Sequence, residues 1–171
     1  ITVLDTIQVA CDTFDEAALY DVSASDNCSA VNLVLDSQTA LDEGCAGSYL
    51  RTYRATDECG NSATADQLIQ LTDDVAPEAS ISCPAGDTLQ VDAACFAETG
   101  TAALGTAEGS AIDNCDDAPS VVVTHSDVTE TPCTGSLLIT RTWTAIATDH
   151  CDNSDTASCT QVILVEDLIA P

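Results

Sequence analysis

The clearest pattern in this chain is the alternation of apolar and polar residues with a period of two. In a strand over Leu137–Ala145, one face would carry Leu137, Ile139, Arg141, Trp143 and Ala145. The other face would carry Leu138, Thr140, Thr142 and Thr144. A shorter alternation covers Val31–Leu35. A period of two, enriched in Thr and Val and interrupted by turn residues, is typical of strands and favours an all-β sandwich.

The strand pattern occurs twice. Residues 51–61 and 141–153 each begin Arg-Thr-aromatic and run into a turn that carries Cys and Asn. A second apolar strand and an Ala-Pro pair follow each turn. Repetition at this spacing predicts two domains, residues 1–77 and 78–171, each of a size suited to a small sandwich. Two repeats in phase also suggest one period of a longer array.

Charge narrows the choice of partners. The 171 residues carry 29 acidic side chains against 3 basic ones, a formal charge of −26, and all three basic residues are Arg. Such a chain repels nucleic acid and anionic membrane surfaces and attracts cations. No apolar run approaches the roughly 18 residues that cross a membrane, so we expect no membrane insertion.

The chain has ten cysteines, and eight of them occupy matching points of the two repeats. The sequence has no Cys-x-x-Cys motif followed by a second such motif or by a His pair, as a zinc site would need. An even number of cysteines in repeated positions therefore indicates a disulfide framework. Disulfides form in oxidising compartments, which predicts an extracellular or cell-surface location.

Strand direction limits the pairings within a repeat. If successive strands alternate in direction, Cys11 and Cys45 lie at one end of the first domain, and Cys28 and Cys59 lie at the other. Cys45 and Cys59 flank a strand that holds them over about 20 Å apart, whereas a disulfide needs Cα atoms within about 7 Å. The expected pairs are therefore Cys11–Cys45 and Cys28–Cys59.

The same reasoning predicts Cys95–Cys133 and Cys115–Cys151 in the second repeat. Cys83 and Cys159 remain. Their counterparts in the first repeat are Ile1 and Ala65, so both members are missing there together. Joint absence is what a bonded pair should show, and we expect Cys83–Cys159 to be the fifth bridge.

Several segments of the second repeat together resemble a hyalin-type repeat. They are Pro77–Pro84, Asp113-Asn-Cys115, Arg141-Thr-Trp-Thr-Ala145, the Thr148–Asn153 turn and the closing Asp167-Leu-Ile-Ala-Pro171. The resemblance covers nearly all of both repeats. It implies immunoglobulin-like sandwiches of the kind used in extracellular matrix, adhesion or surface fibres, without catalysis. Two departures stand out: Asp152 replaces the expected Gly, and two extra residues near Ile146 predict a bulge.

We therefore expect two tandem immunoglobulin-like β-sandwich domains, stapled by disulfides. Because each domain would be entered at one pole and left at the other, the pair is expected to form a linear rod. Copies of the chain, joined head to tail in an array or filament, are the expected partner.

Acidic residues of the loops suggest one ligand site. In a rod, carboxylates of one domain's exit would meet those of the next domain's top loops, as a Ca²⁺ site of six to eight oxygens requires. The candidate ligands are Asp73, Asp74, Asp113, Asp149, Asp152 and Asp167. The alternative is that these side chains hydrogen-bond their own turns or are solvated. No other cofactor is expected.

Four residues are expected to have structural roles. Arg51 and Arg141 occupy equivalent positions on the strand face that also carries Tyr53 and Trp143. An Arg stacked on the ring and paired with a carboxylate would lock the two sheets together. The alternative is a side chain that reaches solvent from the edge of the core.

Two surface features concern partners. Asn27-Cys28-Ser29 fits the N-glycosylation pattern, so Asn27 is a candidate glycan site. The last strand of the second repeat is apolar on both faces, and Val162 and Leu164 are predicted to form an edge where another subunit packs.

The sequence lacks the residue combinations that nucleophilic catalysis needs. The two His residues and the absence of a Gly-x-Ser-x-Gly elbow leave no nucleophile–base pair, and exposed Asp residues have no reason for a raised pKa. We expect a non-enzymatic structural repeat of an extracellular filament or surface fibre. The alternatives are a calcium-dependent adhesin or surface recognition module and, third, an accessory domain of a secreted enzyme.

Overall fold

The computed structural model describes residues 1–41, 44–132 and 135–168. The chain divides into two compact units: residues 1–75 with 114–116, and residues 76–113 with 117–171. The division falls beside the repeat boundary expected at Pro77. The short segment Asn114–Asp116 is the exception, because it belongs to the second repeat by sequence and to the first unit by structure.

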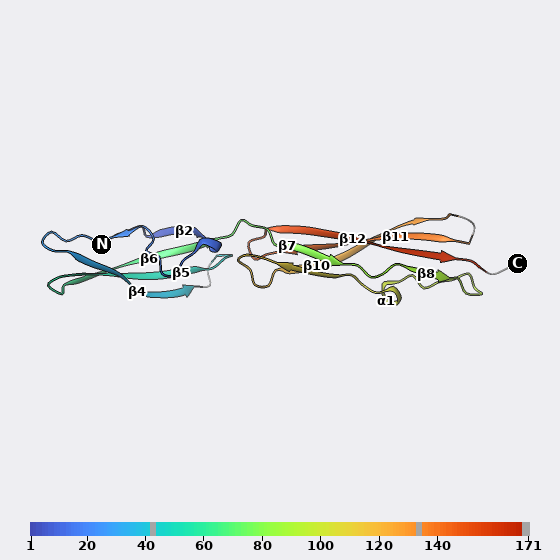
Figure 1. Ribbon diagram of the computed structural model, residues 1–171, viewed down its shortest axis with the longest axis horizontal. Coiled ribbons are helices and arrows are strands. Elements are labelled where there is room, and N and C mark those ends of the chain that lie inside the picture. The colour runs from blue at the N-terminus through green and yellow to red at the C-terminus, as the bar shows by residue number, and fades with distance from the viewer. Residues whose placement is uncertain (42–43, 133–134, 169–171) are drawn as a thin grey trace. The chain divides into compact units, whose positions relative to one another are not determined.

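The first unit is built on a four-stranded sheet in the order β2-β6-β5-β4, with a two-stranded sheet β1-β3 beside it (Figure 1). Its strands are β1 (Thr2–Val3), β2 (Thr6–Ala10), β3 (Val22–Ser23), β4 (Val31–Leu41), β5 (Ser48–Asp57) and β6 (Ser62–Thr72), with a 3-10 turn η1 (Cys11–Thr13) after β2. β2 runs parallel to β6, and the other pairs are antiparallel.

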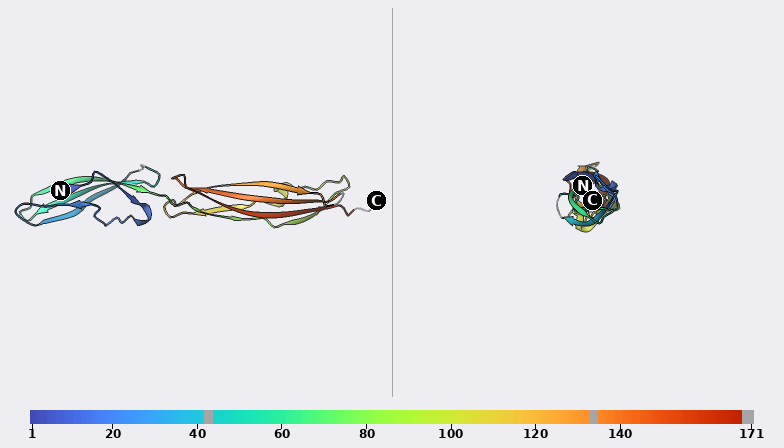
Figure 2. Two further views of the ribbon diagram at one scale, coloured as in Figure 1. Left: turned by 90° about the horizontal axis from the view of Figure 1, so that it is seen from above. Right: turned by 90° about the vertical axis from the view of Figure 1, so that its left-hand side faces the viewer.

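The second unit repeats this layout with the strand order β10-β11-β12-β8 and a small sheet β7-β9. Its long strands β11 and β12, coloured orange to red, lie side by side in Figure 2. Its elements are β7 (Glu78–Ser82), β8 (Asp87–Gln90), α1 (Thr101–Leu104), β9 (Glu108–Ile112), β10 (Ser120–Glu130), β11 (Leu137–Thr148) and β12 (Ser154–Glu166). β8 runs parallel to β12, as β2 does to β6. The predicted all-β class with two sandwich-like domains is confirmed.

Each core is small because only every second residue of the central strands points inward and contributes to it. In the first unit Tyr53 and Ile69 are fully buried. In the second, Ile139, Ile163 and Val165 form the buried cluster, with Leu89, Val91, Ala97, Leu104 and Leu137 packed against it.

Insertion of two residues near Ile146 does not produce the expected bulge. β11 pairs without a register shift with both β10 and β12. It has 12 residues where β5 has 10, so the extra pair lengthens the strand while preserving the alternation of faces. A register shift occurs instead in β4, between Leu35 and Ser37.

Val162 and Leu164 do not form an open edge. β8 pairs with β12, and Leu164 lies opposite Thr88. Gly86 approaches so closely that a Cβ there would lie 2.6 Å from the Val162 carbonyl oxygen. The backbone of β12 is thus covered on this side, so β12 is not an edge strand, and packing of another subunit there stays a prediction. Only the side-chain face remains available, where Val162 is 49% exposed.

Asp152 occupies a left-handed backbone position. Its φ is +65°, and the corresponding residue of the first unit is Gly60, whose φ is +88°. A side chain with a Cβ pays an energetic cost in this region that glycine avoids. The departure from the hyalin-type pattern at Asp152 is therefore a local strain in the β11–β12 turn.

We predict that Asp152→Gly stabilises the second unit by about 0.5–1 kcal/mol, because it relieves this strain. Chemical denaturation of the full chain measures the change. The matched control is Gly60→Asp, which introduces the same strain in the first unit and should destabilise it by a similar amount. An unchanged or lowered stability for Asp152→Gly would contradict the assignment.

Candidate functional site

Arg51 is completely buried in the first unit and ties a loop to the sheet. From β5, its Nε donates to Gln38 Oε1 at 2.6 Å. Its Nη1 donates to the Ala18 carbonyl at 2.6 Å, and Nη2 donates to those of Asp15 and Glu16 at 3.1 and 3.0 Å. The guanidinium therefore holds the backbone of the loop that connects η1 to β3.

Aromatic rings of this loop cover the same guanidinium. Its Cζ lies 5.0 Å from the ring centre of Phe14 and 5.2 Å from that of Tyr20. Phe14 also stacks on Tyr49, with ring centres 4.7 Å apart. The expected stacking of Arg51 thus involves loop aromatics rather than Tyr53, and its side-chain partner is the amide of Gln38 rather than a carboxylate.

Gln67 of β6 forms a second tie in the first unit. It is fully buried, and its Oε1 accepts a hydrogen bond from the Tyr53 hydroxyl at 3.0 Å. Its Nε2 donates to the carbonyls of Leu4 and Tyr20 at 3.2 and 3.1 Å. One amide therefore satisfies a buried hydroxyl and two backbone acceptors from segments that cover the sheet.

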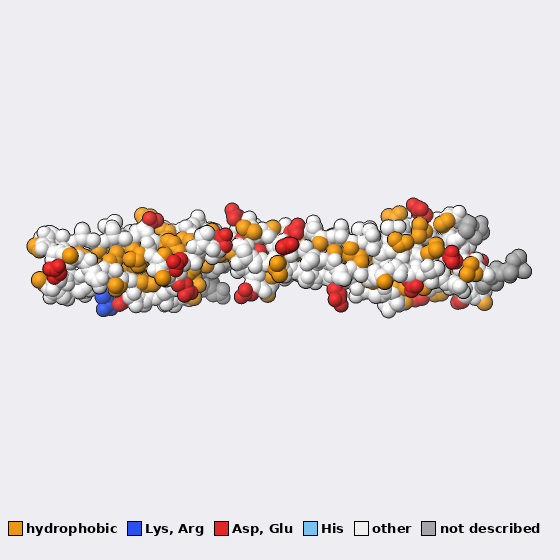
Figure 3. Space-filling model, in the orientation of Figure 1, with side chains coloured by type: hydrophobic (Ala, Val, Ile, Leu, Met, Phe, Trp, Pro, Cys, Tyr) orange, Lys and Arg blue, Asp and Glu red, His pale blue; other side chains and the backbone are white. Residues whose placement is uncertain are grey.

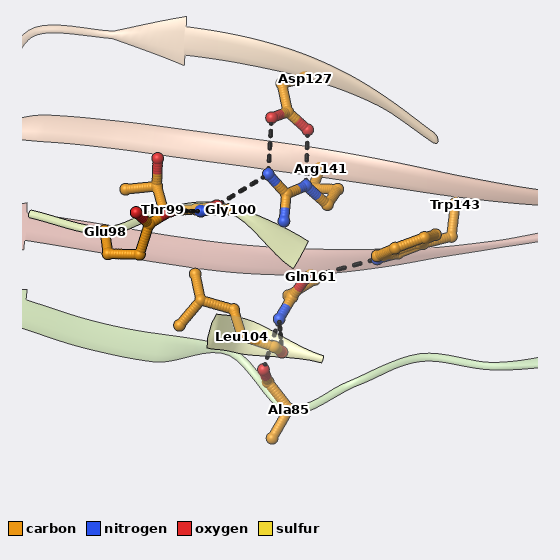
Figure 4. A network of polar contacts seen from close by, with 9 residues as sticks. All are labelled: Ala85, Glu98, Thr99, Gly100, Leu104, Asp127, Arg141, Trp143 and Gln161. Atoms are coloured by element: carbon orange, nitrogen blue, oxygen red, sulfur yellow. Dashed lines mark hydrogen bonds and ion pairs between the residues drawn. The ribbon is translucent and has the colours of Figure 1, made fainter. Parts of the chain in front are cut away.

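The second unit contains the same two ties (Figure 4). Arg141 of β11 holds Asp127 of β10 through two hydrogen bonds, from Nε and Nη2, both 2.8 Å long. Nη2 also donates to the Thr99 carbonyl at 3.0 Å, and Cζ lies 5.9 Å from the Trp143 ring centre. Here the expected pairing of Arg with a carboxylate, beside the aromatic ring, is present.

The Arg141–Asp127 pair shifts both groups. Hydrogen bonding to Arg141 lowers the pKa of Asp127, and the same bond raises the pKa of Arg141. The ion pair therefore favours the charged form of both side chains. Its guanidinium is buried, with a side-chain exposure of 4%, while the carboxylate reaches the surface at 31%.

Gln161 is the counterpart of Gln67. Its Nε2 donates to the carbonyls of Ala85 and Leu104, both at 3.0 Å, and its Oε1 accepts from the Trp143 indole at 3.4 Å (Figure 4). The inward aromatic residue thus differs between the units while its glutamine partner stays the same: Tyr53 bonds to Gln67, and Trp143 bonds to Gln161. The sequence predicted roles for both aromatics and missed both glutamines.

Asp57 and Asp149 build identical turns. In each turn the carboxylate accepts hydrogen bonds from the backbone and the side-chain amide of an Asn four residues later, Asn61 or Asn153, at 2.7–2.9 Å. The bond from the Asn61 side chain is the main cause that lowers the pKa of Asp57. Asp26 caps its own loop, and the hydrogen bond from the Cys28 backbone lowers its pKa. These aspartates therefore stabilise the turns in which they lie.

The structure brings two of the proposed calcium ligands together within the second unit. Carboxylate oxygens of Asp113 and Asp149 lie within 4.8 Å of one another, and Asp152 is exposed in the same turn as Asp149. Asp167, by contrast, follows β12 and lies 3.0 Å from a Cβ built on Gly135, at the opposite end of that sheet. In the first unit, Asp73 and Asp74 follow β6.

One predicted disulfide is present. Cys83 and Cys159 are bonded, with Cα atoms 5.9 Å apart and a sequence separation of 76. The bond joins the segment after β7 to the middle of β12, and so links the small sheet of the second unit to its large sheet.

The remaining pairings differ from those expected. Cys11 is bonded to Cys115, with Cα atoms 5.9 Å apart, instead of forming the expected Cys11–Cys45 and Cys115–Cys151 pairs. Cys45 and Cys151 are also disulfide-bonded. Strand direction determines which end of a sheet a cysteine occupies but not which partner it has there. In the structure, the segment Asn114–Asp116 lies beside Cys11 and supplies its partner.

Three cysteines of the described residues are exposed thiols: Cys28, Cys59 and Cys95. The expected Cys28–Cys59 pair is therefore not formed, and Cys95 is not bonded to Cys133, which lies outside the described residues. Cys11, Cys115 and Asp73 also lie close enough to share a cation. Because both sulfurs are in the disulfide, they are not thiolate ligands.

Asn27 is exposed in the loop that precedes β4. Acidic side chains are scattered over the face shown in Figure 3, and basic side chains appear at one place on it. Exposed apolar residues include Phe96, at 60%, and Val128, at 62%. Among the described residues, no helix has the length and apolar character needed to cross a membrane.

Comparisons with known proteins assign no family. No protein-family model matches the chain, and no curated protein matches it. Solved structures similar to this chain include the extracellular domain of Protocadherin GammaB4 (TM-score 0.41, 16% identity, 92% of this chain and 30% of that one). Others are the human Desmocollin-1 ectodomain (TM-score 0.37, 10% identity, 96% and 40%) and Protocadherin gammaB7 EC3-6 (TM-score 0.38, 13% identity, 98% and 47%).

This chain thus spans less than half the length of each of those structures. At these TM-scores the likeness carries no argument about function.

We predict that Gln67→Leu destabilises the chain by about 2–4 kcal/mol, because two backbone carbonyls and a buried tyrosine hydroxyl lose their partner. The matched control is Gln70→Leu, three residues along the same strand, where the side chain is exposed. Denaturant unfolding of both variants measures the difference. Equal stabilities of the two variants would show that the buried amide is dispensable.

The Arg141–Asp127 pair predicts a pH dependence. Because the folded-state pKa of Asp127 is lowered, its contribution is complete above the ordinary aspartate value of 3.8 and is lost as the pH falls through the folded pKa. Asp127→Asn should therefore be less stable than the parent chain near neutral pH, with a gap that narrows below about pH 4. Urea unfolding between pH 3 and 7 measures the gap.

The control for the ion pair is Asp36→Asn, which removes an exposed pair with Arg54. Such pairs contribute little, so this change should be nearly neutral. A pH-independent gap for Asp127→Asn would contradict the assigned role.

Proposed function

We propose that this chain is a structural repeat unit of an extracellular filament or cell-surface fibre and has no catalytic role. One observation carries the proposal: the loop Asn114–Asp116 of the second repeat folds into the first unit and is bonded there to Cys11. A loop of one repeat that is bonded in the other unit is suited to repeats that are joined in an array rather than to domains that act separately.

The buried hydrogen bonds of Arg and Gln agree with a structural role. In both units a buried Arg and a buried Gln fasten covering loops to the central strands, and the loops are held by their backbone carbonyls. These hydrogen bonds do not depend on which side chains the loops carry, and in the first unit the rings of Phe14 and Tyr20 add contacts with Arg51. The hyalin-type resemblance, with repeats at 1–77 and 78–171, agrees with this proposal.

A location outside the cell follows from the same chemistry. Disulfides such as Cys83–Cys159 persist in an oxidising compartment, and a formal charge of −26 keeps the chain soluble in salt. We propose that the natural partner is a further copy, in a head-to-tail array.

A second candidate is a calcium-dependent adhesin. Proximity of Asp113 and Asp149 favours it, since two carboxylates within 4.8 Å can share a cation. The remaining ligands, from Asp73, Asp74, Asp152 and Asp167, would have to come from neighbouring loops or from another copy. Asp149 already accepts three hydrogen bonds within its own turn, which weakens this candidate.

Electron microscopy of the purified chain under oxidising conditions, with either 5 mM calcium or a chelator, separates the two proposals. A structural repeat should form thin fibres in both conditions. Particles that cluster only with calcium would favour adhesion. Dispersed single particles in both conditions would contradict the filament proposal.

A further inference from the structure

The two units place cysteines at corresponding points. Cys11 directly follows β2, and Cys95 follows β8; these are the strands that run parallel to the last strand of each unit. Cys28 and Cys115 each end an Asp-Asn-Cys loop that precedes a long strand, β4 or β10. By position in the fold, Cys95 therefore corresponds to Cys11, and Cys28 corresponds to Cys115.

Only one of the two corresponding sets is joined. Cys11 is bonded to Cys115, while Cys28 and Cys95 are exposed thiols. Each chain thus contains one completed joint and the two unused halves of a second joint of the same kind. Free thiols of this sort are a liability in an oxidising compartment, which argues that they have a partner there.

The surroundings of the completed joint have counterparts as well. Asn114 Nδ2 contacts the sulfurs of Cys115 and Cys11 at 2.9 and 3.7 Å, and Asp73 lies beside them. Asn27 precedes Cys28 as Asn114 precedes Cys115, and Asp167 follows β12 as Asp73 follows β6. The unused halves therefore carry the same neighbouring residues.

Cys28 has no access to the corresponding cysteine of its own unit. It precedes β4, whose first residue lies opposite Asp57 at the end of β5, whereas Cys11 follows Ala10, opposite Thr72. A strand of 10 residues separates these ends, a distance of about 30 Å. Cys11 of the same unit therefore cannot complete the joint at Cys28, and a counterpart of Cys11 must come from elsewhere.

Space for an incoming loop lies beside Cys95. It lines an open groove of about 320 Å³ whose other walls include Val91, Phe96, Leu137 and Val165. Phe96 is 60% exposed next to the thiol. An apolar floor with a cysteine at its rim suits a short loop that ends in cysteine.

We propose that Cys28 of one chain and Cys95 of a second copy form an intermolecular disulfide, with the loop Asp26–Cys28 seated in the groove beside Cys95. This inference rests on the proposed head-to-tail fibre and names the bond that links its subunits. A fibre could also form by noncovalent contact alone, so the two can fail separately.

The chemistry needs a disulfide oxidant such as oxidised glutathione. The Cys28 thiolate attacks one sulfur of the oxidant and releases one glutathione thiolate. The Cys95 thiolate of the second copy then attacks the Cys28 sulfur of this mixed disulfide and releases the other. Two thiols are oxidised, one glutathione disulfide is reduced to two glutathiones, and two protons leave the cysteines.

Charge explains why a covalent link is useful. Two copies, each with a formal charge of −26, repel one another, and the repulsion acts over about 10 Å at 0.1 M salt. A disulfide holds the copies together at any salt concentration. The link also competes with a glycan on Asn27, since the counterpart Asn114 lies against the bonded sulfurs.

The test is a disulfide map of a one-to-one mixture of unlabelled and ¹⁵N-labelled chains. The mixture is oxidised with glutathione disulfide, alkylated and digested without reduction. We expect a peptide pair linking Cys28 to Cys95, half of it containing one light and one heavy peptide. A Cys28–Cys59 pair within one chain, a same-chain Cys28–Cys95 pair, or alkylated thiols at both positions would overturn the inference.

Blocked chains provide the matched control. In a background of Cys59→Ser with Cys133→Ser, which removes two further cysteines that could compete for the bond, Cys28→Ser and Cys95→Ser should each remain monomeric after oxidation. Their mixture should give disulfide-linked dimers and nothing larger. Dimers of either variant alone would overturn the assignment. Fibres without the Cys28–Cys95 peptide would also overturn it and leave the structural role intact.

Discussion

The organisation of this chain depends on the disulfide between Cys11 and Cys115. It closes a stretch of 104 residues, for which chain-entropy arguments give a stabilisation of about 5 kcal/mol. Its larger effect is on architecture, because it fixes Asn114–Asp116, a loop of the second repeat, in the first compact unit.

Within each unit, polar contacts supplement a small apolar core. The largest fully buried side chains include Arg51, Gln67 and Gln161 alongside Tyr53, Ile69 and Ile163. Buried polar groups cost free energy unless they are hydrogen-bonded, and here they bond mainly to backbone carbonyls of the covering loops. The same arrangement with different partners, Gln38 in one unit and Asp127 in the other, shows which part the fold requires. The requirement is a planar donor on the central strand; the side-chain acceptor on the neighbouring strand varies.

Much of the fold could be predicted from the sequence, because period-two alternation and an internal repeat are local signals. The segments Val31–Leu35 and Leu137–Ala145 are strands, and they extend further than expected. The insertion near Ile146 was misread because two residues preserve the side-chain period, so a longer strand costs less than a bulge. Gln67 and Gln161 were missed because one polar residue in an apolar strand reads as outward-facing; their matching positions in the two repeats were the available signal. Pairing of the cysteines needs the position of every loop at one end of a sheet, which strand direction alone does not provide.

The most direct measurement is the partner of Cys11 in the native, oxidised chain. Partial reduction and non-reducing peptide mapping should recover Cys11 linked to Cys115, in the same molecule, together with the Cys83–Cys159 pair. A Cys11–Cys45 peptide would mean that each repeat closes its own disulfides. The loop Asn114–Asp116 would then have no covalent hold on the first unit, and its assignment to that unit would be contradicted.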